Sequence, residues 1–189
     1  TTASDGPVQT LSFSLATANI PELKAVATMV ASNWTKLGAR VNLEFFESSD
    51  LNQDLIRPRK YETLLFVVFI GRDSDLYPFW HSSQRLDPGL NISMYTNAKV
   101  DKLLEEIRAS TDGSNINSPQ LAEKYRSIAT EIANDHPAIF LYSPYFLYVV
   151  PNDLKGIKIP VFTNSADRFA RIHEWYFETD RVWKIFTYL

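Results

Sequence analysis

The hydrophobic pattern of the first fifty residues predicts a strand, a helix and a second strand. Apolar and polar residues alternate over residues 8–16, as in a half-buried strand. Over residues 19–38 the apolar positions recur every three or four residues, and Pro21 and Gly38 stand where helices begin and end. Alternation returns over residues 39–47. A connection of this length favours a crossover, so we expect the two strands to be parallel.

The most apolar run of the chain comes next. A short helix is predicted first, capped by Ser48 or Ser49 and ended by Pro58. "TLLFVVFIG", residues 63–71, is apolar on both faces, which is typical of a central strand covered from two sides. It leads into residues 71–96, which have no periodicity and are long for a connection, so a functional loop is favoured.

Two amphipathic helices are predicted after this loop. Asn97 suits the N-cap of the first helix, and Ser118–Pro119 suits the start of the second. Two short strands are expected around Ser143–Pro144, followed by an extended piece over residues 153–160. Residues 161–189 are rich in aromatic side chains but show neither a helical nor a strand period.

Composition narrows the class of protein. The chain has 189 residues, of which 45% are hydrophobic and 22% charged, as in a folded domain and unlike a disordered one. It has no cysteine, which excludes disulfides, thiolate metal sites and a cysteine nucleophile. The net charge of −3 argues against a nucleic-acid partner, in spite of "RPRK" at residues 57–60.

Neither a membrane span nor a signal peptide is expected in this stretch of sequence. No apolar run approaches the roughly 18 residues that a spanning helix needs. The opening "TTASDGPVQT" does not have the pattern of a signal peptide, and we interpret it as a cut inside a longer chain.

Motifs of catalysis are absent from the sequence. The three histidines, His81, His136 and His173, stand in no paired metal-ligand spacing, and no GxSxG, SxxK, GxGxxG or phosphate-loop pattern occurs. His136 is expected at the end of a helix and His173 in a structural role. We therefore expect no catalytic residue, no metal and no cofactor.

The loop after the apolar run is the strongest candidate site. Ligands of open α/β sheets bind beyond the carboxyl ends of the strands, where this loop begins. Asp73 or Asp75 suits an ammonium group, and Arg72 suits a carboxylate. The nearby ring side chains suit the walls of a ligand site; they are Tyr77, Phe79, Trp80 and His81. An alternative is that these rings fold the loop onto the lobe while the charges cap it, and the spacing favours neither.

Four pieces of the sequence occur in the order found in one known family. They are "RKYETLLFVVFIGRDSDLYPFWHSSQ", "LNISMYTNAKVDKLLEEIRAST", "EKYRSIATEIANDHPAIFLYSPYFLYVV" and "NDLKGIKIP". The ordered set covers most of the chain. It resembles the carboxy-terminal part of the bacterial extracellular solute-binding proteins of family 5, the oligopeptide- and dipeptide-binding proteins of ABC importers.

This resemblance implies a fold. The chain would be an α/β lobe like those of periplasmic binding proteins, with a mostly parallel central sheet flanked by helices and an irregular, aromatic-rich C-terminal tail. Residues 1–160 would form the C-terminal lobe of a two-lobed binding protein. Residues 161–189 would run back toward the N-terminal lobe, which this stretch of sequence does not contain.

The resemblance also implies a function without catalysis. The chain would belong to the substrate-binding component of an ABC importer, which captures peptides and delivers them to the permease subunits. It would work in the periplasm, or on the outer face of the cytoplasmic membrane through a lipoprotein anchor. A solute-sensing receptor or regulatory domain with the same fold is the alternative, and an enzyme ranks last.

Individual roles follow from the family as well. Relatives pair the peptide amino terminus with an acidic residue after the central strand, which aligns with Arg72 or Asp73 according to the placement of one gap; we choose Asp73. Arg57 or Arg59, before that strand, would meet a peptide carboxylate. Because one lobe holds only half of the cleft, we expect this chain alone to fold but to bind peptide weakly or not at all.

Overall fold

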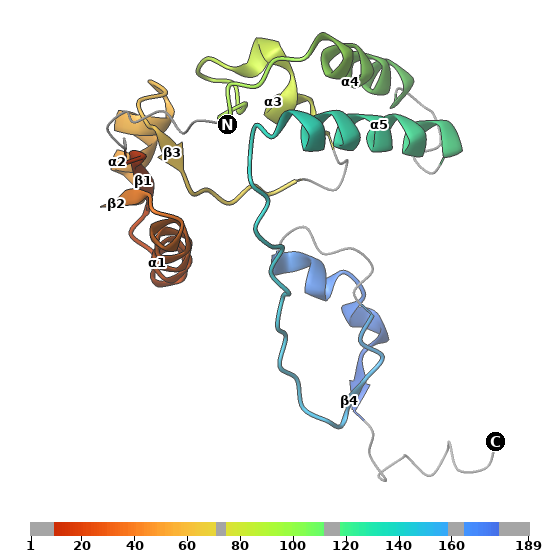
Figure 1. Cartoon of the computed structure of the whole chain (residues 1–189). Helices are drawn as coiled ribbons and strands as arrows, with labels where there is room; N and C mark the ends of the chain where they lie inside the picture. Colours follow the sequence, from red (N-terminus) through yellow and green to blue (C-terminus); the bar gives the residue numbers. More distant parts are fainter. Residues whose placement is uncertain (1–9, 71–74, 112–117, 159–164, 178–189) are drawn as a thin grey trace, which may run out of the picture. The chain divides into compact units, whose positions relative to one another are not determined.

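The computed structural model describes residues 10–70, 75–111, 118–158 and 165–177, and the chain forms two compact units. Unit 1 comprises residues 1–68 and 75–138, and unit 2 comprises residues 69–74 and 139–189. Figure 1 shows the course of the chain through both units. The predicted division into a lobe of residues 1–160 and a tail of 161–189 concerns the complete binding protein and stays a prediction.

Unit 1 begins with a small parallel sheet. Strand β1, Ser12–Ala18, lies between β2, Arg40–Phe46, and β3, Thr63–Leu64. Both neighbours are parallel to β1. Helix α1, Pro21–Lys36, connects β1 to β2, so the predicted strand–helix–strand unit and its parallel pairing are confirmed.

The end of α1 depends on a glycine. Gly38 has a φ of 93°, which L side chains rarely adopt. In this conformation the Gly38 N–H donates to the Thr35 carbonyl, and the Ala39 N–H donates to the Trp34 carbonyl. The last carbonyls of the helix are thus satisfied before β2 begins.

Small side chains in β1 allow the following helical segment to approach the sheet. Ala16 and Ala18 are buried in one cluster with Leu51 and Leu55. Between them Thr17 is fully buried, and its hydroxyl donates to the Leu65 carbonyl at 2.9 Å, which satisfies the buried oxygen.

The predicted short helix exists, but its cap is different. The segment consists of α2, Ser48–Asp50, and a π-helical stretch η1, Leu51–Ile56. Its N-cap position is Glu47, and no side chain makes a capping hydrogen bond there, so the prediction of Ser48 or Ser49 as the cap is wrong. The Ser49 hydroxyl instead donates to the carboxylate of Asp50.

The predicted central strand over residues 63–71 is also wrong. Only Thr63–Leu64 is paired as a strand, at the edge of the sheet, while β1 occupies the centre. Residues 65–70 form no strand, and Phe66 to Ile70 are between 43% and 80% exposed. The boundary between the two units falls inside this run, after Val68. An apolar pattern on both faces predicts that a segment is covered, but it does not identify what covers it.

The second half of unit 1 is helical. Two short turns, α3 (Tyr77–Trp80) and η2 (Ser82–Gln84), precede the longer helices α4 (Ala98–Thr111) and α5 (Pro119–Asp135). Helices α4 and α5 lie side by side (Figure 1). The core between these elements is apolar and consists of Tyr95, Val100, Leu104, Ile107, Ile128 and Ile132.

Both predicted helix caps of this half are confirmed. The Asn97 side-chain oxygen accepts from the N–H groups of Lys99 and Val100 at the start of α4. The Ser118 hydroxyl accepts from the Leu121 N–H at 3.2 Å at the start of α5. His136 is the C-cap of α5 and has the left-handed conformation, so its predicted position at a helix end is confirmed.

Unit 2 contains less regular structure than the sequence predicted. Residues 137–150 form no strand, so the two strands expected around Ser143–Pro144 are absent from this described segment. Strand β4, Leu154–Lys155, pairs antiparallel with β5, Tyr176–Phe177. Two 3₁₀ turns, η3 (Ser165–Phe169) and η4 (Ile172–Glu174), precede β5, and His173 lies in η4.

Unit 2 contains a close backbone contact at Gly156. Gly156 has a φ of 78°, and a Cβ atom at this position would lie 2.1 Å from the Glu174 carbonyl oxygen. Only glycine fits such an approach. The rings of Tyr148, Phe169 and Trp175 pack together beside it, with centroid distances of 5.9 to 6.2 Å.

Within the described parts of the chain, no helix combines the length and the apolar character that crossing a membrane requires.

Candidate functional site

The predicted ligand loop is described from Asp75 onward. Residues 71–74 are outside the described residues, so the roles predicted for Arg72 and for Asp73 stay predictions. Asp75 and the turns α3 and η2 that follow it belong to unit 1, and they pack against α4. The site is therefore built here from Asp75 to Gln84 and from the face of α4 beside them.

Asp75 is paired within unit 1. Its carboxylate accepts from the Arg108 guanidinium at 2.6 and 3.2 Å and from the Tyr77 N–H at 3.1 Å. Partial burial acts to raise the pKa of Asp75, but the hydrogen bonds from Arg108 and Tyr77 and the Arg108 charge outweigh it and lower that pKa. An ammonium ligand at Asp75 would have to compete with these partners, so the geometry favours a role for Asp75 in holding the loop.

Tyr77 lies between two nitrogen-bearing side chains. The Arg108 guanidinium carbon is 3.9 Å from the centre of the Tyr77 ring, a cation–π contact. The Tyr77 ring also stacks on the His81 imidazole: the two ring centres are 4.1 Å apart, and the angle between the ring planes is 14°. We call Arg108, Tyr77 and His81 the three-residue stack. Within it, the contact between Tyr77 and Arg108 joins α3 to α4.

Trp80 belongs to the core rather than to an open ligand wall. Its ring meets Tyr95 edge-on at a centroid distance of 5.9 Å, and it packs against the buried cluster of α4 and α5. Phe79, the remaining predicted wall residue, is half-buried. For Tyr77 and Trp80 the structure supports the alternative in which the aromatic side chains fold the loop onto the lobe.

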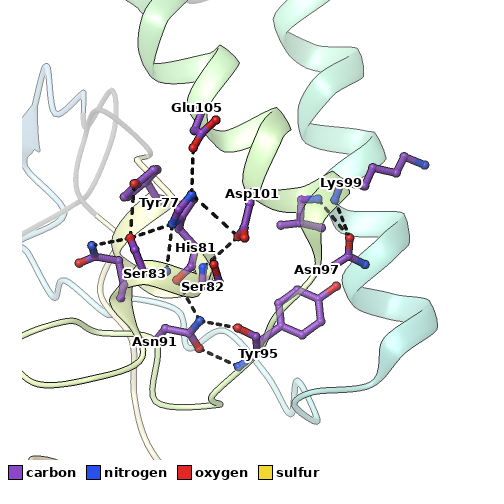
Figure 2. A network of polar contacts seen from close by, with 12 residues as sticks. Tyr77, His81, Ser82, Ser83, Asn91, Tyr95, Asn97, Lys99, Asp101 and Glu105 are labelled. Atoms are coloured by element: carbon purple, nitrogen blue, oxygen red, sulfur yellow. Dashed lines mark hydrogen bonds and ion pairs between the residues drawn. The ribbon is translucent and has the colours of Figure 1, made fainter.

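Among the predicted site residues that the structure describes, His81 is the most enclosed. It is 7% exposed, and its Nδ1 accepts from the Ser83 N–H at 3.1 Å and lies 2.8 Å from the Ser83 hydroxyl. Its Nε2 faces two carboxylates of α4, with Glu105 Oε1 at 3.4 Å and Asp101 Oδ1 at 4.0 Å. Figure 2 shows His81 at the centre of this polar network.

A buried asparagine holds the rest of the loop. The Asn91 side chain, which is 0% exposed, donates to the carbonyls of His81 and Tyr95 and accepts from the Tyr95 N–H (Figure 2). The Tyr95 hydroxyl in turn donates to Asp135 at the end of α5. Burial, together with this hydrogen bond, raises the pKa of Tyr95 to about 12, so the hydroxyl keeps its proton and remains a donor.

The two predicted carboxylate-binding arginines are also engaged inside unit 1. Arg57 makes a two-pronged ion pair with Asp87, each contact at 3.1 Å, and the hydrogen bond that Arg57 donates to Asp87 raises the pKa of Arg57. Arg59 donates to three backbone carbonyls, those of Ile56, Arg85 and Gly89. Arg59 thus connects the segment before β3 to the turn at residues 85–89. All three nitrogen atoms of its guanidinium group are used in this structural role.

Sequence reasoning missed the contribution of α4. Asp101, Glu105 and Arg108 follow one another at intervals of four and three residues, so they share one helix face. That face meets α3 and η2: Asp101 accepts from the Ser82 N–H at 2.9 Å, Glu105 faces His81, and Arg108 holds Asp75. The spacing of these three residues could have predicted a charged helix face, but it could not identify the element that this face contacts.

Metal binding finds no support in the parts of the chain that the structure describes. No group of three or more histidine, aspartate or glutamate side chains there could hold a metal ion. The expectation of no metal and no cofactor stays a prediction.

The fold matches that of known solute-binding proteins. It is similar to the oligopeptide-binding protein AppA from Bacillus subtilis in complex with a nonapeptide, at 26% identity and a TM-score of 0.65 over 89% of this chain and 32% of AppA. It is also similar to NikZ from Campylobacter jejuni in complex with Ni(L-His), at 21% identity and a TM-score of 0.60 over 87% of this chain and 33% of NikZ. The chain thus has the fold of part of a periplasmic-type solute-binding protein, which confirms the predicted fold class.

Sequence comparison gives a homologue. No family model matches the chain. However, it is 30% identical to the oligopeptide-binding protein AppA of Bacillus subtilis (strain 168) over 134 residues. The matched region covers 70% of this chain and 24% of AppA. The chain is a homologue of this oligopeptide-binding protein, in agreement with the predicted resemblance, and it spans about a quarter of the length of this relative.

Proposed function

We propose that this chain is part of the substrate-binding component of an ABC importer, which captures peptides outside the cytoplasm and passes them to permease subunits. The observation that carries the proposal is the 30% identity to an oligopeptide-binding protein over 134 residues. The likeness in fold to the same protein in complex with a nonapeptide supports it. The role is binding and delivery, without catalysis.

Within this proposal the amine of the peptide pairs with Asp73. Asp75, the other acidic side chain of the loop, already has Arg108 and Tyr77 as partners. Arg57 and Arg59 likewise have partners in Asp87 and in three backbone carbonyls. Of Arg72 and Asp73, the two positions that the family resemblance leaves for this role, we choose Asp73, and a closed, partly dry cleft would strengthen its attraction for an ammonium group.

The proposal also requires a second lobe. Phe69 is 80% exposed, and Tyr145, Leu147 and Val149 are each more than 80% exposed. Large apolar surfaces of this kind mark contacts with other protein segments. We infer that the remainder of a complete binding protein covers them, and that this chain alone supplies one part of the cleft.

Calorimetric titration of the complete binding protein with a mixed-sequence nonapeptide tests the function. We expect saturable binding, and no comparable heat with nickel–histidine. Absence of binding to nonapeptides and to shorter peptides would contradict the proposal. Mass spectrometry of ligand that co-purifies with the protein provides an independent check on the class of solute.

The role of Asp73 needs a sharper experiment. We expect Asp73→Ala to weaken nonapeptide binding about tenfold or more, because a charge-assisted hydrogen bond contributes roughly 1.5–3 kcal/mol. Acetylating the peptide amine should weaken binding to the unsubstituted protein by a similar factor and should have little further effect on Asp73→Ala. Asp54→Ala, which removes an exposed carboxylate elsewhere in unit 1, is the matched control. Additive losses from acetylation and Asp73→Ala would remove Asp73 from the amine site.

A further inference from the structure

The turn that Arg59 connects to the segment before β3 belongs to a closed loop of unit 1. The Asn91 N–H donates to the Gln84 carbonyl at 3.0 Å, which joins the two ends of residues 84–91. Within this segment the Gly89 N–H donates to the Leu86 carbonyl at 2.7 Å, so the chain reverses direction over a few residues. We call residues 84–91 the closed loop.

Polar contacts from the segment before β3 hold the closed loop in place. Arg59 donates to the carbonyls of Arg85 and Gly89, at 2.8 and 2.6 Å. Arg57 binds Asp87 through two hydrogen bonds of 3.1 Å. A loop that is fixed in this way loses little conformational freedom when a partner binds it, which favours binding.

In spite of this support, the closed loop presents large apolar side chains at the surface. Leu86 is 72% exposed and Leu90 is 50% exposed. The carbonyls of Arg85, Leu86 and Gly89 already have donors inside unit 1. The exposed run at residues 145–149 differs, because it is extended and has no strand neighbour in the described part of the chain. A loop with a supported backbone and exposed leucines is typical of a surface that meets a separate protein.

The charges around the leucines indicate the chemistry of that protein. The contacts of Arg57 and Arg59 bring both side chains to the closed loop, which itself carries Arg85 and Asp87. These three guanidinium groups and one carboxylate have two net positive charges, in a chain whose overall net charge is −3. A complementary surface has apolar side chains flanked by carboxylates.

We propose that the closed loop is a docking surface for a permease subunit of the importer. Its partner is an outward-facing segment of that subunit with apolar side chains flanked by carboxylates. Leu86 and Leu90 form the apolar centre of the contact, and the arginines around them form its charged rim. This inference rests on the proposed function, because that function makes an importer the partner.

Binding to the permease tests the surface directly. The complete binding protein is immobilised, and binding of the importer's permease subunits, reconstituted in lipid nanodiscs, is measured by biolayer interferometry. We expect Leu86→Glu to weaken this binding about tenfold or more, because residues at the centre of an interface carry most of the binding energy. Met29→Glu, at a 67% exposed position of α1, is the matched control and should bind like the unsubstituted protein. Equal binding of Leu86→Glu and the unsubstituted protein would overturn the proposal.

A second substitution at the same position tests the acidic character of the partner. Leu86→Lys also removes the apolar contact, but carboxylates on the partner attract lysine and repel glutamate. Leu86→Lys should therefore bind at least about threefold more tightly than Leu86→Glu. Equal affinities of the two variants would contradict an acidic partner.

Three further outcomes would assign the closed loop to a different occupant and overturn the proposal. Equal binding to empty nanodiscs would make lipid the partner. A dimer of the complete protein that dissociates in Leu86→Glu, seen by sedimentation velocity, would make a second copy the partner. A fall of several degrees in the melting temperature of Leu86→Glu, without such a fall in Met29→Glu, would show that the rest of the binding protein covers the leucine.

Calorimetric titration with the nonapeptide separates this inference from the proposed function. We expect Leu86→Glu and the unsubstituted protein to bind the nonapeptide equally. Peptide binding without any binding to the permease nanodiscs would overturn the docking surface alone. Binding to the permease nanodiscs that is lost in Leu86→Glu, from a protein that binds no peptide, would overturn the proposed peptide ligand alone.

Discussion

Asp75 and Arg57, two charged side chains at the candidate loop and just before it, already have partners inside unit 1. Asp75 is held by Arg108 and by the Tyr77 N–H, and Arg57 is held by Asp87. A paired charge must give up its partner before it can bind a ligand, which costs free energy. Pairing therefore identifies Asp75 and Arg57 as charges that hold the structure around the loop, an assignment that residue type alone does not make.

The pairing of Asp75 predicts a loss of stability in acid. Partial burial acts to raise the pKa of Asp75, but its hydrogen bonds and the Arg108 charge lower it overall. A carboxyl whose pKa is lower in the folded state stabilises the fold above the unfolded value of about 3.9, and this stabilisation is lost as the pH falls through the folded value. Between about pH 5 and about pH 2.5 we expect the melting temperature to fall more steeply for the unsubstituted protein than for Asp75→Asn.

Circular dichroism at a series of pH values measures this difference. Asp54→Asn, at an exposed position, should follow the unsubstituted protein. Parallel curves for Asp75→Asn and the unsubstituted protein would show that the pair with Arg108 contributes nothing to stability.

The regular elements of unit 1 are set largely by local signals. Asn97 and Ser118 cap α4 and α5 as their positions in the sequence predicted, and Gly38 ends the segment of α1. These signals act within a few residues, through backbone groups that lack a partner at helix ends. Other helical segments begin without a side-chain cap: Ile20, Glu47 and Leu76 occupy the cap positions of α1, α2 and α3 without such a bond.

Removing the cap of α5 should have a measurable cost. The Ser118 hydroxyl accepts from the Leu121 N–H, so Ser118→Ala leaves that donor without its partner. We expect the free energy of unfolding to fall by about 1 kcal/mol in urea titrations. Ser32→Ala, at an exposed position inside α1, should be neutral or slightly stabilising because alanine has the higher helix propensity. Equal effects of the two substitutions would argue against the cap.

Each unit of the molecule has its own packing, and both carry exposed apolar side chains. In unit 2 the exposure alternates along an extended segment: Tyr145, Leu147 and Val149 are 94%, 85% and 93% exposed, whereas Phe146 is 41% exposed. Alternation of this kind is the pattern of a strand with one uncovered face. The sequence predicted strands here, and a strand needs hydrogen-bonded neighbours that the described part of this chain does not supply.

Introducing a charged side chain at Leu147 tests whether this exposed face is covered in the complete protein, because a charge lowers stability only where it becomes buried. We expect Leu147→Lys to cost at least about 2 kcal/mol in the complete binding protein, where the side chain would be buried. In the 189-residue chain the same substitution should change stability little, because Leu147 is 85% exposed there. Ala133→Lys, at an exposed position of α5, is the control in both proteins. A small effect of Leu147→Lys in both would contradict the inferred cover.

The sequence by itself determined the strand–helix–strand start, the parallel pairing, the caps of α4 and α5, and the homology to an oligopeptide-binding protein. These follow from periodicity and from short-range signals, which act between residues close in the chain. Tertiary structure alone decided that β1 is the central strand, that Asp75 pairs with Arg108, and that His81 faces Glu105. Such contacts join residues 24 or more positions apart, or depend on which neighbours cover an apolar run, and no local pattern specifies them.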